Sequence, residues 1–572
     1  MLKSLTDFID RLEVPGDNQI NKNTGWINRD VIPLPPQRRT WTDWDFIGFW
    51  AVIALSITTW QSCSSLLDLG LNVWQSMVIV IISKFLIFLI AVSHGWGGGV
   101  WHVGFPIYSR YTFGLWGSYL GLIQRIFLCI IWYAVQSYTA GQCMSVLLSS
   151  IFPTFNTLHN TLPESLPMTT KEFIGFIIYH VLSIPFLYIP PEKFKHPFRA
   201  VSLISFFTIF GTSIGSMVHA KGAGELLHVG SDINSSAARG MAWIHGINTI
   251  INAYAVGLAN QPDFSRFVHR RGQQIWGQAF SILILGTIIP LFGLLGTSAA
   301  AQKYGNVNEL NLWNPPNIIE QWLLESYSPK ARCASFFASF GFFVSTLGLN
   351  AIDNAVSGGI DLVAIAPKFI NIRRGAYIIM IISIAINPWQ IVSKATIFVD
   401  VLSSYGCFLG PMIAIMTSDF FIVRKQKLKL IDLYNPSKDS IYWFTGGINW
   451  RAYVSWVCGF VPGITGFASV NPALASRVPE PAVKMFDISF IIGYVISFLV
   501  HVILNYFFPP KGLKEIDHID YYHAFTNEEA IQLGMDQVEF NIPYDANELR
   551  EQCSSSLKTT KALYIQDEYE RA

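Results

Sequence analysis

The sequence FIGFWAVIALSITTWQSCSSL, residues 46–66, is an apolar stretch with a polar interruption near its middle. It is long enough to cross a bilayer, which takes about 20 helical residues. Ser56-Ile57-Thr58-Thr59 breaks the apolar pattern. Because a polar interruption inside a membrane helix is costly unless it lines a cavity, we expect a spanning helix that is broken beside a binding site.

A second interruption lies in the apolar segment 242–260, where residues 252–263 read NAYAVGLANQPD. Broken helices at corresponding positions of two five-helix halves are typical of inverted-repeat transporters. Either break alone would also fit Ser, Thr and Gly residues that let helices pack closely. The matched pair favours a transporter.

The composition places the chain in a membrane. Hydrophobic residues make up 51% of the 572 residues and charged residues only 13%, against roughly 25% charged residues in soluble proteins. This excludes a nucleic-acid-binding protein, a disordered scaffold and a disulfide-rich secreted module. The net charge of +1 indicates no polyanionic partner. Seven cysteines without CxxC spacing predict neither a metal site nor a disulfide framework, and we expect no cofactor.

We predict an all-α integral membrane protein with about twelve transmembrane helices. The segments expected to span the bilayer are 46–66, 72–93, 119–150, 171–190, 199–220, 242–260, 275–300, 333–355, 376–392, 396–423, 452–470 and 485–507. They form one transporter domain, 46–507, between an N-terminal tail, 1–45, and a C-terminal tail, 508–572.

Alternate loops between these segments are basic, which indicates that they face the cytoplasm. They carry Lys193/Lys195/Arg199, Arg266/Arg270/Arg271, Lys368/Arg373/Arg374 and Arg424/Lys425/Lys427/Lys429. Both termini are therefore predicted to be cytosolic, in a protein of the plasma membrane. The glycosylation sequon at Asn234 falls in a loop predicted to lie outside.

Polar side chains at membrane depth are the candidate site residues. Trp132 and Gln136 lie four residues apart on one helix face. An indole for stacking and a carboxamide that donates and accepts hydrogen bonds suit a planar heterocycle with amide edges. The alternative is an interfacial Trp and a Gln bonded to a neighbouring helix. Asp353 is a functional candidate because ionisable residues in spans are rare, or else a carboxylate at a helix end. Lys84 is interpreted as a side chain that extends to the interface.

Catalytic motifs are absent from the sequence. It contains no hydrolase elbow, P-loop or zinc-protease motif, and the glycine-rich run 95–99 lacks a strand–turn–helix setting, so it is interpreted as a loop hinge. We therefore do not expect an enzyme.

Several motifs, taken in order, resemble the nucleobase–cation symporter-1 family, specifically its fungal uracil/allantoin/uridine/thiamine permease branch. They are Arg38-Arg39-Thr40-Trp41, His102-Val103-Gly104-Phe105-Pro106, Asn260-Gln261-Pro262-Asp263-Phe264-Ser265-Arg266-Phe267, Pro367-Lys368-Phe369-Ile370-Asn371-Ile372-Arg373-Arg374-Gly375, Ser418-Asp419-Phe420 and Gly447-Ile448-Asn449-Trp450-Arg451-Ala452. The similarity runs from about Asn28 to Phe525.

The resemblance implies a LeuT-type fold that works by alternating access. Two inverted five-helix repeats would occupy about 46–220 and 242–423, followed by two extra helices at about 452–507. It also implies that the substrate ring stacks between Trp132 and Tyr254, while Gln136 and Asn354 read its edges.

Two departures from the family pattern bear on the substrate and the coupling ion. Ser56 stands at the first break, where uracil-type relatives carry Asn. Thiamine-type relatives, like this chain, carry Ser there. Gly348 and Leu349 stand where sodium-coupled relatives carry Ser and Thr hydroxyls, and a hard cation needs several oxygen ligands. The resemblance therefore favours proton coupling over sodium. Asp353 is the candidate proton carrier, or alternatively the counter-ion of a cationic substrate.

The predicted function is proton-coupled import of a small nucleobase-like compound of the uracil, allantoin or uridine class. The alternative keeps the transporter and changes the substrate to thiamine or nicotinamide riboside. A membrane sensor that binds its ligand without transporting it is a third hypothesis. The family also leads us to expect ubiquitin-ligase targeting of tail lysines such as Lys558 and Lys561.

Overall fold

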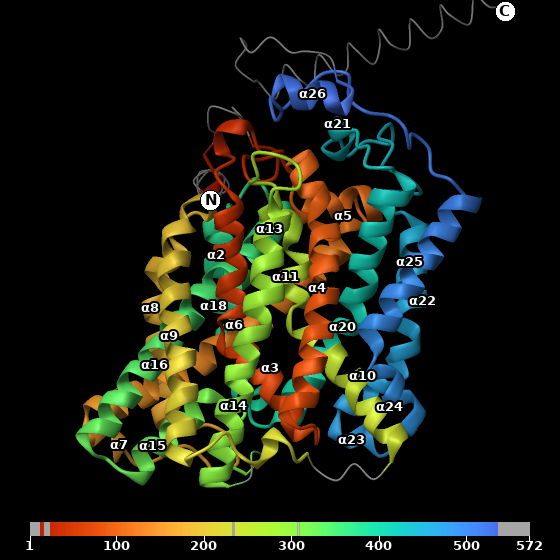
Figure 1. The fold of residues 1–572 in the computed structure, drawn as a ribbon. Helices are drawn as coiled ribbons and strands as arrows, with labels where there is room; N and C mark the ends of the chain where they lie inside the picture. Colours follow the sequence, from red (N-terminus) through yellow and green to blue (C-terminus); the bar gives the residue numbers. More distant parts are fainter. Residues whose placement is uncertain (1–11, 16–22, 231–234, 306, 308, 536–572) are drawn as a thin grey trace, which may run out of the picture.

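A computed structural model describes residues 12–15, 23–230, 235–305, 307 and 309–535. In this part of the chain the regular elements are helices, with two isolated β-bridges and no strand. Figure 1 shows the long helices side by side in one bundle. Nine of them are long and apolar enough to cross a membrane, and a bent pair makes a tenth span.

The ten spans agree with ten of the twelve expected segments. They are α2–α3 (Asp43–Ala54 and Ile57–Asp68), α4 (Val73–Trp101), α6 (Ser118–Ile151), α8 (Thr170–Leu187), α9 (Lys195–Ala220), α13–η4–α14 (Gln274–Ala279, Phe280–Leu285 and Gly286–Tyr304), α16–η5–α17 (Pro329–Leu349, Asn350–Val356 and Ser357–Ile365), α20–η7 (Ala395–Ser418 and Asp419–Val423), α22 (Trp450–Phe467) and α25 (Ser489–Phe507).

The other two expected segments are divided into shorter helices. The segment 242–260 covers most of α10 (Ser236–Ala253) and all of α11 (Ala255–Ala259), and is followed directly by α12 (Gln261–Ser265). The segment 376–392 covers most of α18 (Ile372–Ser383) and all of η6 (Ile384–Ile386) and α19 (Pro388–Ile391). In the second case the division falls at Asn387, which has a left-handed backbone (φ +55°) and precedes a proline. The predicted all-α, multi-pass class is confirmed.

Short helices connect the spans at both ends of the bundle. They are η1 (Pro36–Arg38), α5 (Phe105–Phe113), α7 (Pro153–Asn156), η2 (Pro191–Lys193), η3 (Glu225–Leu227), α15 (Pro315–Glu325), α21 (Leu430–Leu433), η8 (Ala468–Val470), α23 (Pro472–Ala475), α24 (Glu480–Phe486) and α26 (Asn527–Leu533).

The glycine-rich run 95–99 is helical, so its interpretation as a loop hinge is wrong. It forms the last turns of α4, which continues to Trp101. A Cβ at Gly98 would stand 2.7 Å from the carbonyl oxygen of Pro262, and one at Gly97 would collide with the Tyr108 hydroxyl. The glycines are therefore explained by the close approach of α12 and α5 to α4.

The outer surface of the bundle suits lipid. Large apolar side chains such as Ile81, Phe85, Leu499 and Ile503 are each more than half exposed. One end of the bundle, which we call the terminal face, is formed by residues 23–42 and 511–535. Figure 1 shows α26 at the same end as the start of α2. The sequon residue Asn234 and the tail lysines Lys558 and Lys561 lie outside the described residues.

Candidate substrate site

The predicted break in the first span is present. The axes of α2 and α3 differ by 46° across the break. Ser56 caps α3, because its hydroxyl accepts a hydrogen bond from the backbone N–H of Thr59 (3.2 Å). The carbonyl oxygen of Leu55, which the break leaves without a helical partner, accepts one from the Ser345 hydroxyl of α16 (2.8 Å). The break is thus held by a neighbouring span.

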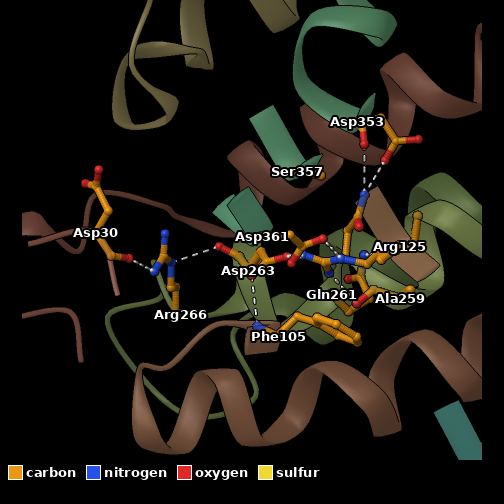
Figure 2. Close-up of polar contacts among 12 residues, drawn as sticks. Asp30, Phe105, Arg125, Ala259, Gln261, Asp263, Arg266, Asp353, Ser357 and Asp361 are labelled. Atoms are coloured by element: carbon orange, nitrogen blue, oxygen red, sulfur yellow. Dashed lines mark hydrogen bonds and ion pairs between the residues drawn. The ribbon is translucent and has the colours of Figure 1, made fainter. Parts of the chain in front are cut away.

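The predicted break in the segment 242–260 is also present. The helix stops at Ala253, and Tyr254 adopts φ −104° and ψ 3°, outside the helical range. Asn260 marks a second interruption before α12. Its side-chain N–H₂ donates to the backbone carbonyl (3.0 Å) and the Oδ1 (3.1 Å) of Asp353, two of the contacts drawn in Figure 2. This amide ties the break to η5.

A small cavity lies between the two breaks, and every site residue predicted from the sequence lines it. These residues are Ser56, Trp132, Gln136, Tyr254, Asp353 and Asn354. The cavity volume is about 20 Å³, whereas a single water needs about 10–15 Å³. A planar heterocycle therefore requires the cavity walls to move apart.

Two carboxamide side chains face this cavity and differ in their hydrogen bonding. The Gln136 amide makes no hydrogen bond to any described residue, so its donor and acceptor are both free. Asn354 donates to the side-chain oxygen of Asn350 (2.8 Å). Asn350 is fixed in turn by the backbone carbonyl of Tyr133 (3.1 Å) and the hydroxyl of Tyr179 (2.9 Å). Asn354 thus presents its oxygen as a fixed acceptor.

The aromatic walls come from different spans. Trp132 packs edge-on against Phe398, with ring centroids 6.2 Å apart. Tyr254 lies parallel to Trp50 at 6.4 Å, and its hydroxyl shares a 2.8 Å hydrogen bond with Thr59. Thr59 also donates to the carbonyl of Ile53 (3.0 Å). The Tyr254 ring is therefore anchored directly to the first break.

Asp353 lies in the middle of a continuous span and not at a helix end. The span continues from Pro329 to Ile365, ten residues beyond the predicted end of 333–355. Asp353 is in the π-helical stretch η5, is 8% exposed and faces the cavity. The helix-end alternative for this residue is wrong.

A buried ion cluster that was not predicted from the sequence lies close to Asp353 (Figure 2). Arg125 of α6 pairs with both carboxylate oxygens of Asp361 (2.5 Å each) and with Asp263 (2.7 Å), and all three side chains are fully buried. Figure 2 shows the three together, with Asp263 also accepting from the backbone N–H of Phe105. An arginine inside the apolar segment 119–150 was the available signal. The cluster ties together α5, α6, α12 and α17.

The interpretation of Lys84 as a side chain that extends to the membrane interface is wrong. It is fully buried in α4 and does not reach an interface. Its ammonium nitrogen stands 3.2 Å from the centre of the Tyr254 ring. It therefore lies directly behind a wall of the cavity.

A second, larger cavity of about 670 Å³ opens at the terminal face. Asn28, Arg38, Glu192 and Arg373 are among its lining residues, and Val356 lies at its inner side, two residues after Asn354. This cavity, which we call the vestibule, reaches the span that carries Asp353.

Known permeases are similar to this chain over most of its length. Residues 33–493 match the family described as permease for cytosine/purines, uracil, thiamine, allantoin. The chain is 37% identical to the transporter aclS of Aspergillus oryzae, over 90% of this chain and 91% of that protein. It is 34% identical to the uracil permease of Saccharomyces cerevisiae, over 85% and 76%.

Among solved structures, the inward-facing conformation of Mhp1, a nucleobase-cation-symport-1 family transporter, superimposes with a TM-score of 0.65 at 16% identity. The match covers 90% of this chain and 99% of Mhp1. It confirms the LeuT-type fold that the motifs implied. The chain therefore belongs to the family of permeases for cytosine and purines, uracil, thiamine and allantoin, and is a multi-pass membrane transporter and not an enzyme.

Proposed function

We propose that the protein imports a small, neutral nucleobase-like compound of the uracil, allantoin or uridine class across the plasma membrane, together with a proton. The observation that carries this proposal is the free Gln136 carboxamide beside Trp132 in the cavity between the two breaks. A cyclic amide or imide offers a flat face for the indole and a paired donor and acceptor for the carboxamide.

The choice of proton over sodium as the coupling ion rests on the span α16–η5–α17. Gly348 packs against Val201 of α9, where a Cβ would stand 2.8 Å from the valine methyls, and Leu349 is buried at the cavity. Neither offers a side-chain oxygen to a hard cation. Asp353, which faces the same cavity, is the proposed proton carrier.

Import also requires a direction. The basic residues of several loops gather at the terminal face, where Lys368 pairs with Glu13 and Arg266 donates to the carbonyl of Asp30 (2.9 Å). By the positive-inside rule we assign this face to the cytosol. The vestibule is then the exit path, and release requires the contacts between the cavity and Val356 to open.

A cationic vitamin such as thiamine or nicotinamide riboside is the second candidate. It is favoured by the Asp353 carboxylate at the cavity and by the short Ser56 hydroxyl at the first break. The two candidates differ in the charge of the ring that the site accepts.

The test is uptake of labelled uracil, allantoin, uridine, thiamine and nicotinamide riboside by yeast that lack their own permeases of this branch, at two external pH values. We expect saturable uptake of a neutral compound, faster at low pH and unchanged when choline replaces sodium. Uptake confined to thiamine or the riboside would support the second candidate. Binding without accumulation would indicate a sensor.

A further inference from the structure

Lys84 is a buried lysine with no counter-charge in the described part of the chain. Its side chain is fully buried in α4, and its ammonium makes neither a hydrogen bond nor an ion pair there. The hydrocarbon stem packs against α14, where a Cβ at Gly286 would stand 3.3 Å from Cδ and Cε. An ionisable residue buried in a span is expensive and so usually serves a function.

The contact that Lys84 does make is with a cavity wall. Its nitrogen lies 3.2 Å from the centroid of the Tyr254 ring, over one face. Cations are attracted to aromatic faces by the ring quadrupole. Because the ammonium covers this face, a substrate can stack on Tyr254 only from the opposite side.

The Tyr254 ring is held in place, so a ligand that stacks on it lies at a set distance from Lys84. The Tyr254 hydroxyl is hydrogen-bonded to Thr59, and the backbone of Tyr254 forms the break after α10. A ligand ring stacked at about 3.5 Å would place its centre about 7 Å from the ammonium. A single aromatic ring between two charges does little to screen them.

We propose that Lys84 acts through the Tyr254 ring as a charge filter that makes the cavity select neutral planar rings over cationic ones. This inference rests on the proposed substrate site and deepens it by naming the residue that makes the site select a neutral substrate. Two unit charges about 7 Å apart, at an effective dielectric constant of about 20, change a binding constant on the order of 50-fold. Lys84 is a positioning residue and does not itself line the cavity.

Asp353 opposes this effect from the other side of the cavity. Its Oδ1 is partly compensated by the hydrogen bond from Asn260 (3.1 Å), whereas the Lys84 ammonium has no hydrogen-bonding partner among the described residues and contacts only the face of the Tyr254 ring. We therefore expect the positive charge to dominate in the unaltered protein. Removal of each charge should shift selectivity in opposite directions.

The test measures binding of two isosteres to the full-length protein in lipid nanodiscs. The cationic probe is 1-methylnicotinamide and the neutral one is 3-methylbenzamide, which has the same shape. We expect the unaltered protein to prefer the neutral compound. Lys84→Met should weaken this preference by on the order of 50-fold, and Asp353→Asn should strengthen it.

Several outcomes would overturn the proposal. They are a Lys84→Met variant with an unchanged preference, an unaltered protein that prefers the cation, and failure of both isosteres to bind. Lys84→Gln provides the same reading if the methionine variant does not fold. Because binding is measured without transport, lack of uptake with an intact preference would refute the proposed function alone. Uptake of uracil with a preference that ignores Lys84 would refute the charge filter alone.

Discussion

Replacement of Glu529 by Gln should release the C-terminal segment from the bundle. Both carboxylate oxygens of Glu529 on α26 accept hydrogen bonds from Nη1 of Arg39 (2.8 and 2.7 Å). Arg39 is 2% exposed and also donates to the carbonyls of Leu34 and Ala524. A glutamine keeps the capping box that Glu529 forms with Thr526, so the variant removes the charge and leaves the helix start intact.

The size of the effect follows from two observations. Removal of one partner of a fully buried ion pair costs about 3–5 kcal/mol, and the 18% exposure of Glu529 reduces this value. Partial burial opposes ionisation of Glu529, but the neighbouring His102 imidazole (3.7 Å), the hydrogen bonds from Arg39 and the Arg39 charge outweigh it and lower its pKa to about 2. A shift of this size corresponds to roughly 3 kcal/mol. We expect a loss of about 2–3 kcal/mol in the free energy of attachment.

Hydrogen exchange of the backbone amides in α26 measures this loss directly. A loss of 2–3 kcal/mol predicts exchange that is roughly 30- to 150-fold faster in Glu529→Gln. The matched control is Glu528→Gln, the same change at the preceding, exposed position of the same helical turn. Equal exchange in the two variants would refute the role of the ion pair.

The pH dependence has a definite sign. The pKa of Glu529 is depressed in the folded protein, so its contribution is fully present above the ordinary glutamate pKa of about 4.3. It is lost as the pH falls through about 2. The contribution of Glu529 to the corrected protection of α26 should therefore be constant above about pH 5 and should fall between about pH 4.5 and 2, while the glutamine variant lacks this fall.

Three further predictions concern the bundle interior. Trp132→Ala and Gln136→Ala should each abolish uptake while the protein still reaches the cell surface, with Gln124→Ala on the same helix as the control; unchanged kinetics in both would remove the proposed pocket. Asp353→Asn should flatten the pH dependence of uptake because an amide carries no proton, and an unchanged pH profile would make Asp353 structural. Arg125→Leu should leave Asp361 and Asp263 buried and unpaired at a cost of about 3–5 kcal/mol; normal surface expression and thermal stability would contradict this.

Much of the fold could be predicted because hydropathy reports directly on the length of a span. The residues at which the spans end could be predicted less well from the sequence. The span α16–η5–α17 continues past Asp353 through Gly358 and Gly359. A Cβ at Gly359 would stand 2.7 Å from the carbonyl oxygen of Ile372. Such glycines look like the end of a helix in a sequence. Their cause is the close packing of α17 on α18, which only the folded structure reveals.

The candidate site was accessible for a different reason. Ser56, Trp132 and Gln136 are polar or aromatic side chains within apolar segments and can be recognised locally. The resemblance to the permease family identified Tyr254 and Asn354 as site residues. Arg125 and Asp361 are separated by 236 residues, and no local pattern states that they pair. The position of Lys84 against Tyr254 likewise depends on how α4 packs on the broken helix.

Two kinds of buried charge in the bundle bear on mechanism. Arg125 is surrounded by carboxylates and ties four helices together, so its charge is compensated. Among the described residues, Lys84 and Asp353 have no ion-pair partner; Asp353 lines the cavity between the breaks, and Lys84 lies behind the Tyr254 wall of that cavity. Because uncompensated charge in a span is costly, it is retained where a ligand or a proton can respond to it. The cavity is the place in the bundle where both charges could act on the same ligand.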